Sequence, residues 1–256
     1  MLIENDKMIE INKIYNEDCL IGMAKIPDGS VDMILCDLPY GTTNCHWDTI
    51  IPFEPLWEHY KRVIKPNGAI VLTASQPFTS MLVMSNIKMF KYEWIWEKNH
   101  FTNFLNCSKM VGKSHENILI FSMGNLIYKP QMEKGNPYIQ KRGKRQPCAV
   151  VRQPINESVT INTSGDRYPK SIIKIDSEHG KHPTQKPVAL FEYLIRTYTN
   201  EGETVLDNCI GSGTTAIACI RSGRQFIGFE TDEGYYKASL KRIENELSKQ
   251  RITFGE

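Results

Sequence analysis

Residues 204–229 read TVLDNCIGSGTTAIACIRSGRQFIGF, and this stretch decides the fold. It starts with a short apolar segment and passes through a turn that contains Gly211 and Gly213. A helical segment follows from about residue 214 to 221, and a second apolar segment occupies residues 226–229. A strand, a glycine turn, a helix and a strand in this order predict a βαβ unit, which is the repeating element of parallel α/β sheets.

Strand-like and helix-like segments alternate through much of the remaining chain. The other predicted strands are residues 11–16, 31–36, 69–73, 92–96 and 118–121, and the other predicted helices are residues 19–26, 55–64 and 188–198. Such alternation predicts an α/β domain with a mostly parallel sheet and helices on both faces.

Length and composition exclude several classes of protein. A chain of 256 residues that is 41% hydrophobic can bury a full core, and its formal charge of +2 says little about partners. The seven cysteines lack CxxC spacing and the first seven residues have no apolar signal core, so we expect a cytoplasmic protein. There is no run of about 18 apolar residues, so we expect no membrane span.

The tetrapeptide Asp37-Leu38-Pro39-Tyr40 directly follows the predicted strand at 31–36. It offers a carboxylate, a carbonyl and a flat ring at the mouth of the sheet. Pro39 biases Leu38 toward an extended conformation, which aims the Leu38 carbonyl. These groups could hold the exocyclic amino group of a nucleobase, although a proline-containing β-turn is by itself common.

The glycine turn predicts a cofactor site. It lacks the third glycine of the dinucleotide fingerprint and the lysine of a phosphate-binding loop. Glu230 ends the following strand about twenty residues beyond Gly211, where a carboxylate meets ribose hydroxyls. Ribose recognition without a pyrophosphate site favours a nucleoside cofactor. The alternative is a turn that serves packing alone, with Glu230 as a cap.

Together the two motifs carry a family resemblance. Residues 37–40 and 206–215 resemble the acid-Pro-Pro-Tyr and Asp-Pro-Phe-x-Gly-Ser-Gly-Thr signatures of the DNA amino-methyltransferases. Their order is similar to that of the circularly permuted beta group, and HPTQKP at 182–187 strengthens the match. The resemblance covers residues 14–240. It implies a Rossmann-like methyltransferase fold with a sheet of the seven-stranded type, S-adenosylmethionine as cofactor and double-stranded DNA as partner.

The resemblance also implies roles for individual residues. Asp37, Leu38, Pro39 and Tyr40 would be catalytic. The implied cofactor-binding residues are Asp18, Cys19, Asp37, Lys186, Pro187, Asp207, Cys209, Gly211, Ser212, Gly213, Thr214, Thr215 and Glu230. Tyr40 and Trp96 would stack on the target base, although a core role for Trp94 or Trp96 is an alternative. We interpret residues 114–117 as structural and predict no metal site.

Residues 125–180 break the α/β pattern and are rich in basic and polar residues. We predict three parts: residues 1–124 form the catalytic part of the methyltransferase domain, 125–180 a basic target-recognition insert, and 181–256 the cofactor-binding part of the same domain. The predicted DNA-binding residues are Lys141, Arg142, Lys144, Arg145, Arg152 and Arg167. A passive solvated loop is the alternative reading of this insert.

Methyl transfer to adenine N6 is the predicted reaction, with Asp37 and the Leu38 carbonyl each accepting one amino hydrogen. Cytosine-N4 transfer is the nearest alternative, but that branch commonly has serine where this chain has Asp37. Cytosine-C5 transfer needs a thiol, and Cys148 lies in the insert, after the wrong motif. RNA or protein-amide methylation, a catalytically silent DNA-binding protein and a nicotinamide dehydrogenase are weaker alternatives. A homodimer and a cognate restriction endonuclease are left open.

Overall fold

The computed structural model describes residues 9–42, 45, 48–144, 146–147, 154, 156–178 and 185–254. Several residues named above therefore lie outside the described part of the chain, namely Arg145, Cys148, Arg152 and residues 182–184. By its internal contacts the chain divides into two compact units. The first consists of Met1–Lys129 and Ser171–Glu256, and the second is Pro130–Lys170.

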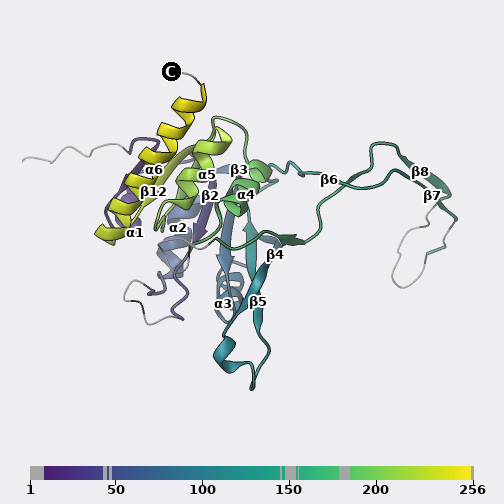
Figure 1. The fold of residues 1–256 in the computed structure, drawn as a ribbon, viewed down its shortest axis with the longest axis horizontal. Helices are drawn as coiled ribbons and strands as arrows, with labels where there is room; N and C mark the ends of the chain where they lie inside the picture. Colours follow the sequence, from purple (N-terminus) through teal and green to yellow (C-terminus); the bar gives the residue numbers. More distant parts are fainter. Residues whose placement is uncertain are drawn as a thin grey trace, which may run out of the picture. The chain divides into compact units, whose positions relative to one another are not determined.

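The first unit is built on one central sheet (Figure 1). Its eight strands are, in spatial order, β1 (Lys13–Tyr15), β12 (Gln225–Phe229), β11 (Thr204–Asp207), β2 (Val31–Asp37), β3 (Ile64–Ala74), β5 (Lys113–Phe121), β4 (Phe90–Thr102) and β10 (Ile172–Lys174). Only β5 runs antiparallel to its neighbours β3 and β4. The mostly parallel sheet is confirmed. Its eighth strand, β10, was not predicted, because three residues inside a polar segment give no periodic signal.

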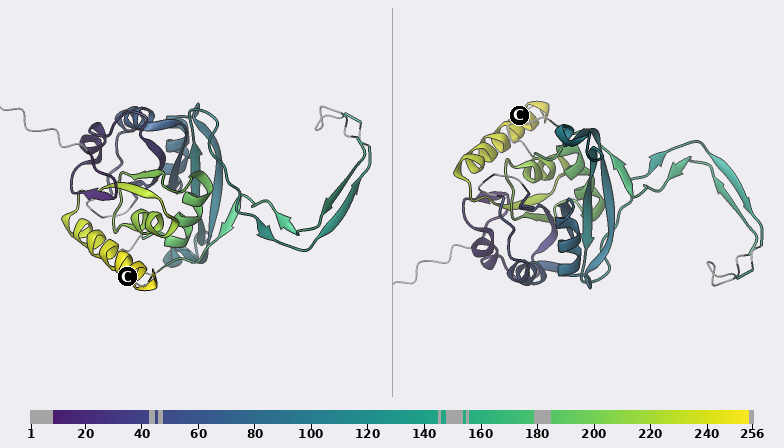
Figure 2. Two further views of the ribbon diagram at one scale, coloured as in Figure 1. Left: turned by 90° about the horizontal axis from the view of Figure 1, so that it is seen from above. Right: turned by 90° about the horizontal axis from the view of Figure 1, so that it is seen from below.

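Helices cover both faces of the sheet, as predicted (Figure 2). They are α1 (Cys19–Ala24), α2 (Phe53–Val63), α3 (Phe78–Ser85), α4 (Val188–Tyr198), α5 (Thr214–Ser222) and α6 (Glu233–Phe254). Alternate side chains of β2 enter opposite cores: Met33 and Leu35 pack with α4 and α5, whereas Ile34 and Cys36 pack with α1 and α2. This alternation explains why the whole of β2 is apolar.

Sequence patterns did not reveal α3 or α6. The second of these is rich in charged residues, and its apolar contacts with the core come from partly buried side chains such as Tyr236 and Ile243. Among the described residues, no helix combines the length and the apolar character needed to cross a bilayer.

The strand arrangement sets the position of the two motifs. In the register of the sheet, Tyr15 pairs with Phe229 and Asp207 pairs with Gly228, so β1, β12 and β11 end at one edge. The parallel strand β2 ends at the same edge with Asp37. The carboxyl ends of adjacent parallel strands form the usual ligand-binding crevice of open α/β sheets.

Gly22 in α1 makes close helix–sheet packing possible. A Cβ at this position would lie 2.1 Å from Cε1 of the buried Phe229 ring. We expect Gly22→Ala to lower the free energy of unfolding by about 1–3 kcal/mol, because a packed core resists extra atoms. Thermal unfolding should show a melting temperature lower by roughly 3–10 °C. Gly143→Ala, where an added Cβ meets nothing within 4 Å, is the matched control, and equal melting temperatures for both variants would contradict the packing argument.

The second unit is an antiparallel ribbon and not a structureless loop. In it β6 (Glu133–Lys134) pairs with β9 (Asp166–Arg167), and β7 (Tyr138–Arg142) pairs with β8 (Ser158–Asn162). The unit is shorter than the predicted insert, because β10 belongs to the main sheet. Its role in target recognition stays a prediction.

Candidate active site

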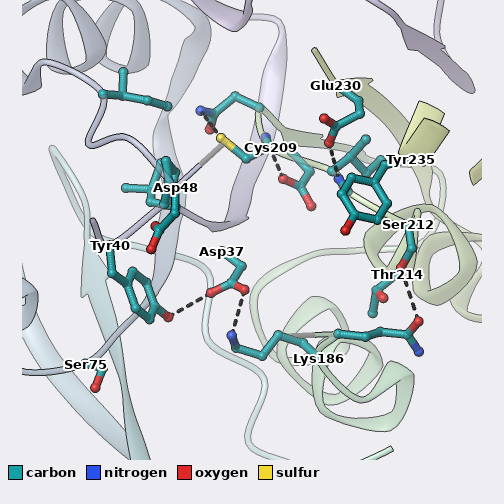
Figure 3. A pocket seen from close by; sticks show the side chains of 18 of the residues that line it. Asp37, Tyr40, Asp48, Ser75, Lys186, Cys209, Ser212, Thr214, Glu230 and Tyr235 are labelled. Carbon is teal, nitrogen blue, oxygen red and sulfur yellow. Dashed lines mark hydrogen bonds and ion pairs between the residues drawn. The ribbon is translucent and has the colours of Figure 1, made fainter. Parts of the chain in front are cut away.

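A pocket of about 740 Å³ opens where β2, β11 and β12 end. Both motifs contribute to its wall, and Figure 3 shows Asp37 and Lys186 between Tyr40 on one side and Glu230 on the other. The predicted site residues that line the pocket are Asp18, Cys19, Asp37, Leu38, Pro39, Tyr40, Trp96, Lys186, Asp207, Cys209, Gly211, Ser212, Thr214 and Glu230. The volume is that of a small-molecule site.

Three residues predicted to bind cofactor do not form part of this lining. Pro187 is the residue before α4 and Gly213 is the residue before α5, where its φ of 85° suits glycine. The Thr215 hydroxyl is buried and donates a hydrogen bond to Asp207 Oδ2. All three are buried, and each is next in the chain to a residue that lines the pocket.

Hydrogen bonds from the backbone hold the cofactor turn. Glu230 Oε2 accepts from Gly211 N at 2.9 Å, and Glu230 Oε1 accepts from Asp232 N at 2.8 Å. Burial raises the pKa of Glu230 above its usual range, and these two N–H groups oppose the shift. Each carboxylate oxygen has a second lone pair, so Glu230 can cap the turn and still accept from a ligand.

Asp207 stabilises the same turn from inside the protein. It is buried, and its Oδ1 accepts from Cys209 N at 3.0 Å. Burial raises the pKa of Asp207 to about 7, against the opposing hydrogen bonds from Thr215 and Cys209. These contacts make Asp207 a support for the turn.

Asp18 begins helix α1. Its Oδ1 accepts from Leu20 N at 2.8 Å and from Ile21 N at 3.3 Å, which satisfies two free donors of the first turn. The side chain also lines the pocket, so it can be reached by a ligand. Its predicted contact with a cofactor adenine stays a prediction.

Both carboxylate oxygens of Asp37 have partners in the catalytic turn. Oδ1 accepts from the Tyr40 hydroxyl at 2.7 Å and from the Thr73 hydroxyl, and Oδ2 lies 2.6 Å from Lys186 Nζ. Asp37 is part-buried, with a quarter of its side chain exposed. The carboxylate is therefore oriented before any substrate arrives.

Lys186 joins two carboxylates within the pocket. Its side chain is only 7% exposed, and Nζ lies 2.6 Å from Asp37 Oδ2 and 3.2 Å from Glu116 Oε2. Glu116 also pairs with Lys98. Burial alone would lower the pKa of Lys186, but Asp37 and Glu116 hold it above its usual value. Burial would likewise raise the pKa of Glu116, and Lys186 with Lys98 lowers it instead.

Glu116 and Lys98 also belong to the site, although neither was predicted from the sequence and the interpretation of residues 114–117 was a structural one. The pairing of β4 with β5 sets Trp96 opposite Glu116 and brings both to the pocket. A strand-period pattern of polar residues after Trp96 is the signal that could have found Lys98.

The rings of Tyr40 and Trp96 form part of the wall. Tyr40 is stacked on Phe78 with a centroid distance of 5.2 Å, so only its other face can receive a base, and Lys186 Nζ lies 5.7 Å from the Tyr40 centroid. Trp96 is 2% exposed, and its indole N–H donates to Ile175 O at 2.8 Å. Trp94 and Trp96 both belong to the hydrophobic core of the first unit, where the Trp94 indole N–H donates to the Tyr198 hydroxyl. Stacking on Trp96 stays a prediction.

The predicted DNA-binding residues that the structure describes divide into two kinds. Lys141, Arg142 and Lys144 are exposed. The Arg167 guanidinium donates to Gly165 O at 2.8 Å and to a second backbone carbonyl at 2.5 Å, and it lies 4.4 Å from the Tyr138 ring centroid. Arg167 thus joins the two arms of the ribbon, which leaves fewer N–H groups of its guanidinium for DNA.

Comparison with known proteins decides the family. The model of the DNA methylase family matches residues 31–241. The chain belongs to this family. It is an S-adenosylmethionine-dependent DNA methyltransferase, and the predicted membership of the DNA amino-methyltransferases is confirmed. The nicotinamide dehydrogenase alternative is thereby excluded.

Relatives and solved structures agree with this assignment. The chain is 30% identical to the DNA adenine methyltransferase YhdJ of Escherichia coli (strain K12), covering 92% of this chain and 83% of that protein. It is 25% identical to the type II methyltransferase M.HpaI of Haemophilus parainfluenzae, covering 92% and 75%. The crystal structure of the M1.HpyAVI–SAM complex superposes with a TM-score of 0.62 at 25% identity, covering 90% and 98%. The cytosine-N4-specific PvuII DNA methyltransferase shares the fold, with a TM-score of 0.63 at 16% identity over 97% of this chain and 95% of that one.

Proposed function

We propose that this methyltransferase modifies N6 of an adenine that has been extruded from duplex DNA. The observation that carries the proposal is the position of Asp37, an oriented carboxylate in the same pocket as the glycine turn and Glu230. An enzyme that reacts at a base must take it out of the stack, and a pocket lined by Tyr40 and Trp96 suits a flat ring. The adenine specificity named for YhdJ supports adenine over cytosine.

The pocket residues fit S-adenosylmethionine. An added Cβ on Gly211 would meet no atom within 4 Å, so the backbone of the turn is open to a ligand. Glu230 would accept from the ribose hydroxyls, and Asp18 would accept from the adenine amino group. When bound, the cofactor supplies an electrophilic methyl group.

The protein's own groups then act on the target amine. The nitrogen lone pair of an adenine amino group is delocalised into the ring, which makes it a poor nucleophile. Asp37 and the Leu38 carbonyl would each accept one amino hydrogen and so direct the lone pair out of the ring plane. Asp37 would also stabilise the positive charge that develops on nitrogen, which is electrostatic catalysis by a preorganised group.

The reaction product tests the proposal. Purified protein, S-adenosylmethionine and duplex DNA should yield N6-methyladenine when the product nucleosides are resolved by mass. The recognition site follows from sequencing the modified bases in DNA from cells that express the chain. N4-methylcytosine as the product would overturn the adenine assignment and favour the reaction named for the PvuII enzyme.

Glu230→Ala should weaken S-adenosylmethionine binding about 10- to 100-fold, because hydrogen bonds to a charged group contribute roughly 1.5–3 kcal/mol. Isothermal titration calorimetry on the purified variant measures the change. Glu230→Gln keeps one acceptor oxygen and should lie between the wild type and the alanine variant. Glu233→Gln, on an exposed pair with Lys237, is the control. An unchanged dissociation constant in Glu230→Ala would remove this residue from the cofactor site.

Further partners are also proposals. We propose that Lys141, Arg142 and Lys144 contact DNA phosphates, because all three are exposed on the ribbon unit. The type II methyltransferase names of M.HpaI and of M2.DpnII of Streptococcus pneumoniae support pairing with a restriction endonuclease. A homodimer and a cytoplasmic location stay predictions.

A further inference from the structure

The strands β4 and β5 continue beyond the sheet as a long hairpin. Figure 1 shows the hairpin extending past α3, and a 3-10 turn at Phe104–Asn106 lies at its end. The last paired residues are Thr102 and Lys113. Asn103 adopts a left-handed conformation there, and its side chain accepts from Lys113 N at 3.0 Å, so hydrogen bonds define the turn.

Large apolar side chains gather at this end and are open to solvent. We define the hairpin tip as Phe101, Phe104, Leu105, Met110 and Val111. Leu105 is 93% exposed, Val111 87% and Phe104 74%. The rings of Phe101 and Phe104 stack with a centroid distance of 6.2 Å. Clustered apolar exposure of this kind marks a binding surface in soluble proteins.

The charge around the tip indicates an anionic partner. Residues 98–115 contain three lysines and two histidines but no aspartate or glutamate, whereas the whole chain has 29 acidic residues in 256. Lys109 is exposed at the tip. Lys98 is paired with Glu116 in the pocket, so Lys109 and Lys113 are the lysines that carry the positive charge near the tip. Apolar side chains beside positive charge, in a segment that has no carboxylates, suit a nucleic acid, which combines stacked bases with phosphates.

The hairpin is continuous with the active-site pocket. Trp96, Lys98, His100 and Thr102 follow one another at strand spacing along β4, and all four line the pocket. Lys113 from β5 lines it as well. One side of the hairpin is therefore the pocket wall, and the tip extends from its outer rim, where DNA must lie if one of its bases enters the pocket.

We propose that the hairpin tip inserts into the base stack of the substrate duplex beside the extruded adenine. This inference rests on the proposed function. Apolar side chains that enter between base steps unstack them and promote opening of the duplex, and burial of the exposed rings favours the inserted state. The tip would thus lower the cost of extrusion without contacting the reacting atoms.

The double variant Phe104→Ser with Leu105→Ser tests the wedge, because both side chains are exposed and their loss leaves the core intact. The duplex carries the site found by sequencing, with 2-aminopurine in place of the target adenine. We expect the variant to bind this duplex at least tenfold more weakly than the wild type does. It should also lose most of the increase in 2-aminopurine fluorescence that the wild type produces when it extrudes the base. The dissociation constant for S-adenosylmethionine should not change. A duplex that lacks the base opposite the target needs less opening, so on this duplex the variant's loss of affinity should be less than threefold.

The exposed pair Met84→Ser with Ile87→Ser, outside the tip, is the matched control and should bind as the wild type does. Wild-type affinity and fluorescence in the tip variant would overturn the proposal, and so would an equal defect on both duplexes. Loss of a wild-type dimer in the tip variant, with DNA affinity kept, would assign the tip to a second copy of the chain. Failure of the wild type itself to methylate adenine would instead overturn the proposed function.

Discussion

Asp37→Ala should lower kcat for methyl transfer by about 10³-fold, the size of effect seen when one preorganised electrostatic group is removed. The loss follows from geometry, because Tyr40, Thr73 and Lys186 hold Asp37 Oδ1 and Oδ2 in the pocket, where the proposed function places the target amine. Single-turnover transfer at saturating DNA and cofactor measures the chemical step. Tritiated S-adenosylmethionine gives the sensitivity that a loss of this size requires.

Controls separate chemistry from folding. Asp28→Asn removes an exposed carboxylate that pairs with Arg62 and should keep wild-type kcat. The dissociation constant of Asp37→Ala for S-adenosylmethionine should stay within a few-fold of the wild-type value if Glu230 and the glycine turn hold the cofactor. A variant that folds, binds both ligands and transfers methyl at the wild-type rate would show that Asp37 is not catalytic.

Lys186→Met should lower kcat by about 10²-fold and also destabilise the protein. The ammonium is the shared counter-charge of Asp37 and Glu116, and removal of one partner from a buried ion pair costs on the order of 3 kcal/mol. Without it Asp37 loses the contact that orients Oδ2. The lysine therefore has a positioning role toward Asp37 in addition to any contact with cofactor.

The stability loss in Lys186→Met should depend on pH, and its sign follows from Glu116. In the wild type Lys186 and Lys98 hold the pKa of Glu116 below its usual value against the effect of burial, so Glu116 contributes stability above its unfolded-state pKa. In the variant only Lys98 opposes the effect of burial, so the pKa of Glu116 should rise, and the folded state should lose stability as the pH rises through that pKa. The difference in melting temperature between wild type and variant should be larger at pH 8 than at pH 5.

Lys98→Met is the matched control, because Lys98 pairs with Glu116 and has no ion pair with Asp37 among the described contacts. It should lose stability in the same pH-dependent way and keep kcat within a few-fold of the wild type. Equal losses of kcat in the two lysine variants would mean that Lys186 acts through Glu116 and the packing of the wall, and not through Asp37.

Much of the fold could be predicted because its strands and helices have clear local periodicity. The predicted helix at 188–198 has the same bounds as α4, and the βαβ unit at 204–229 differs from the observed elements by no more than a residue at each end. β10 had no such pattern, and along the extension of the β4–β5 hairpin the residues that recur at strand spacing after Trp96 are polar and give no apolar signal. Their strand form depends on pairing, β10 with β4 and the hairpin's two arms with each other.

The sequence by itself determined the chemistry of the two motifs and the family they belong to, because a turn such as residues 37–40 or 207–213 is defined by its own residues. Tertiary structure decided which charges meet. Lys186 lies 149 positions from Asp37 in the chain. It comes just before α4, which packs on β2, and Glu116 is on β5, two strands from β2, so the packing of α4 and the strand order bring Lys186, Asp37 and Glu116 together. Ion pairs between distant segments depend on strand order and burial, and neither is written in a local pattern.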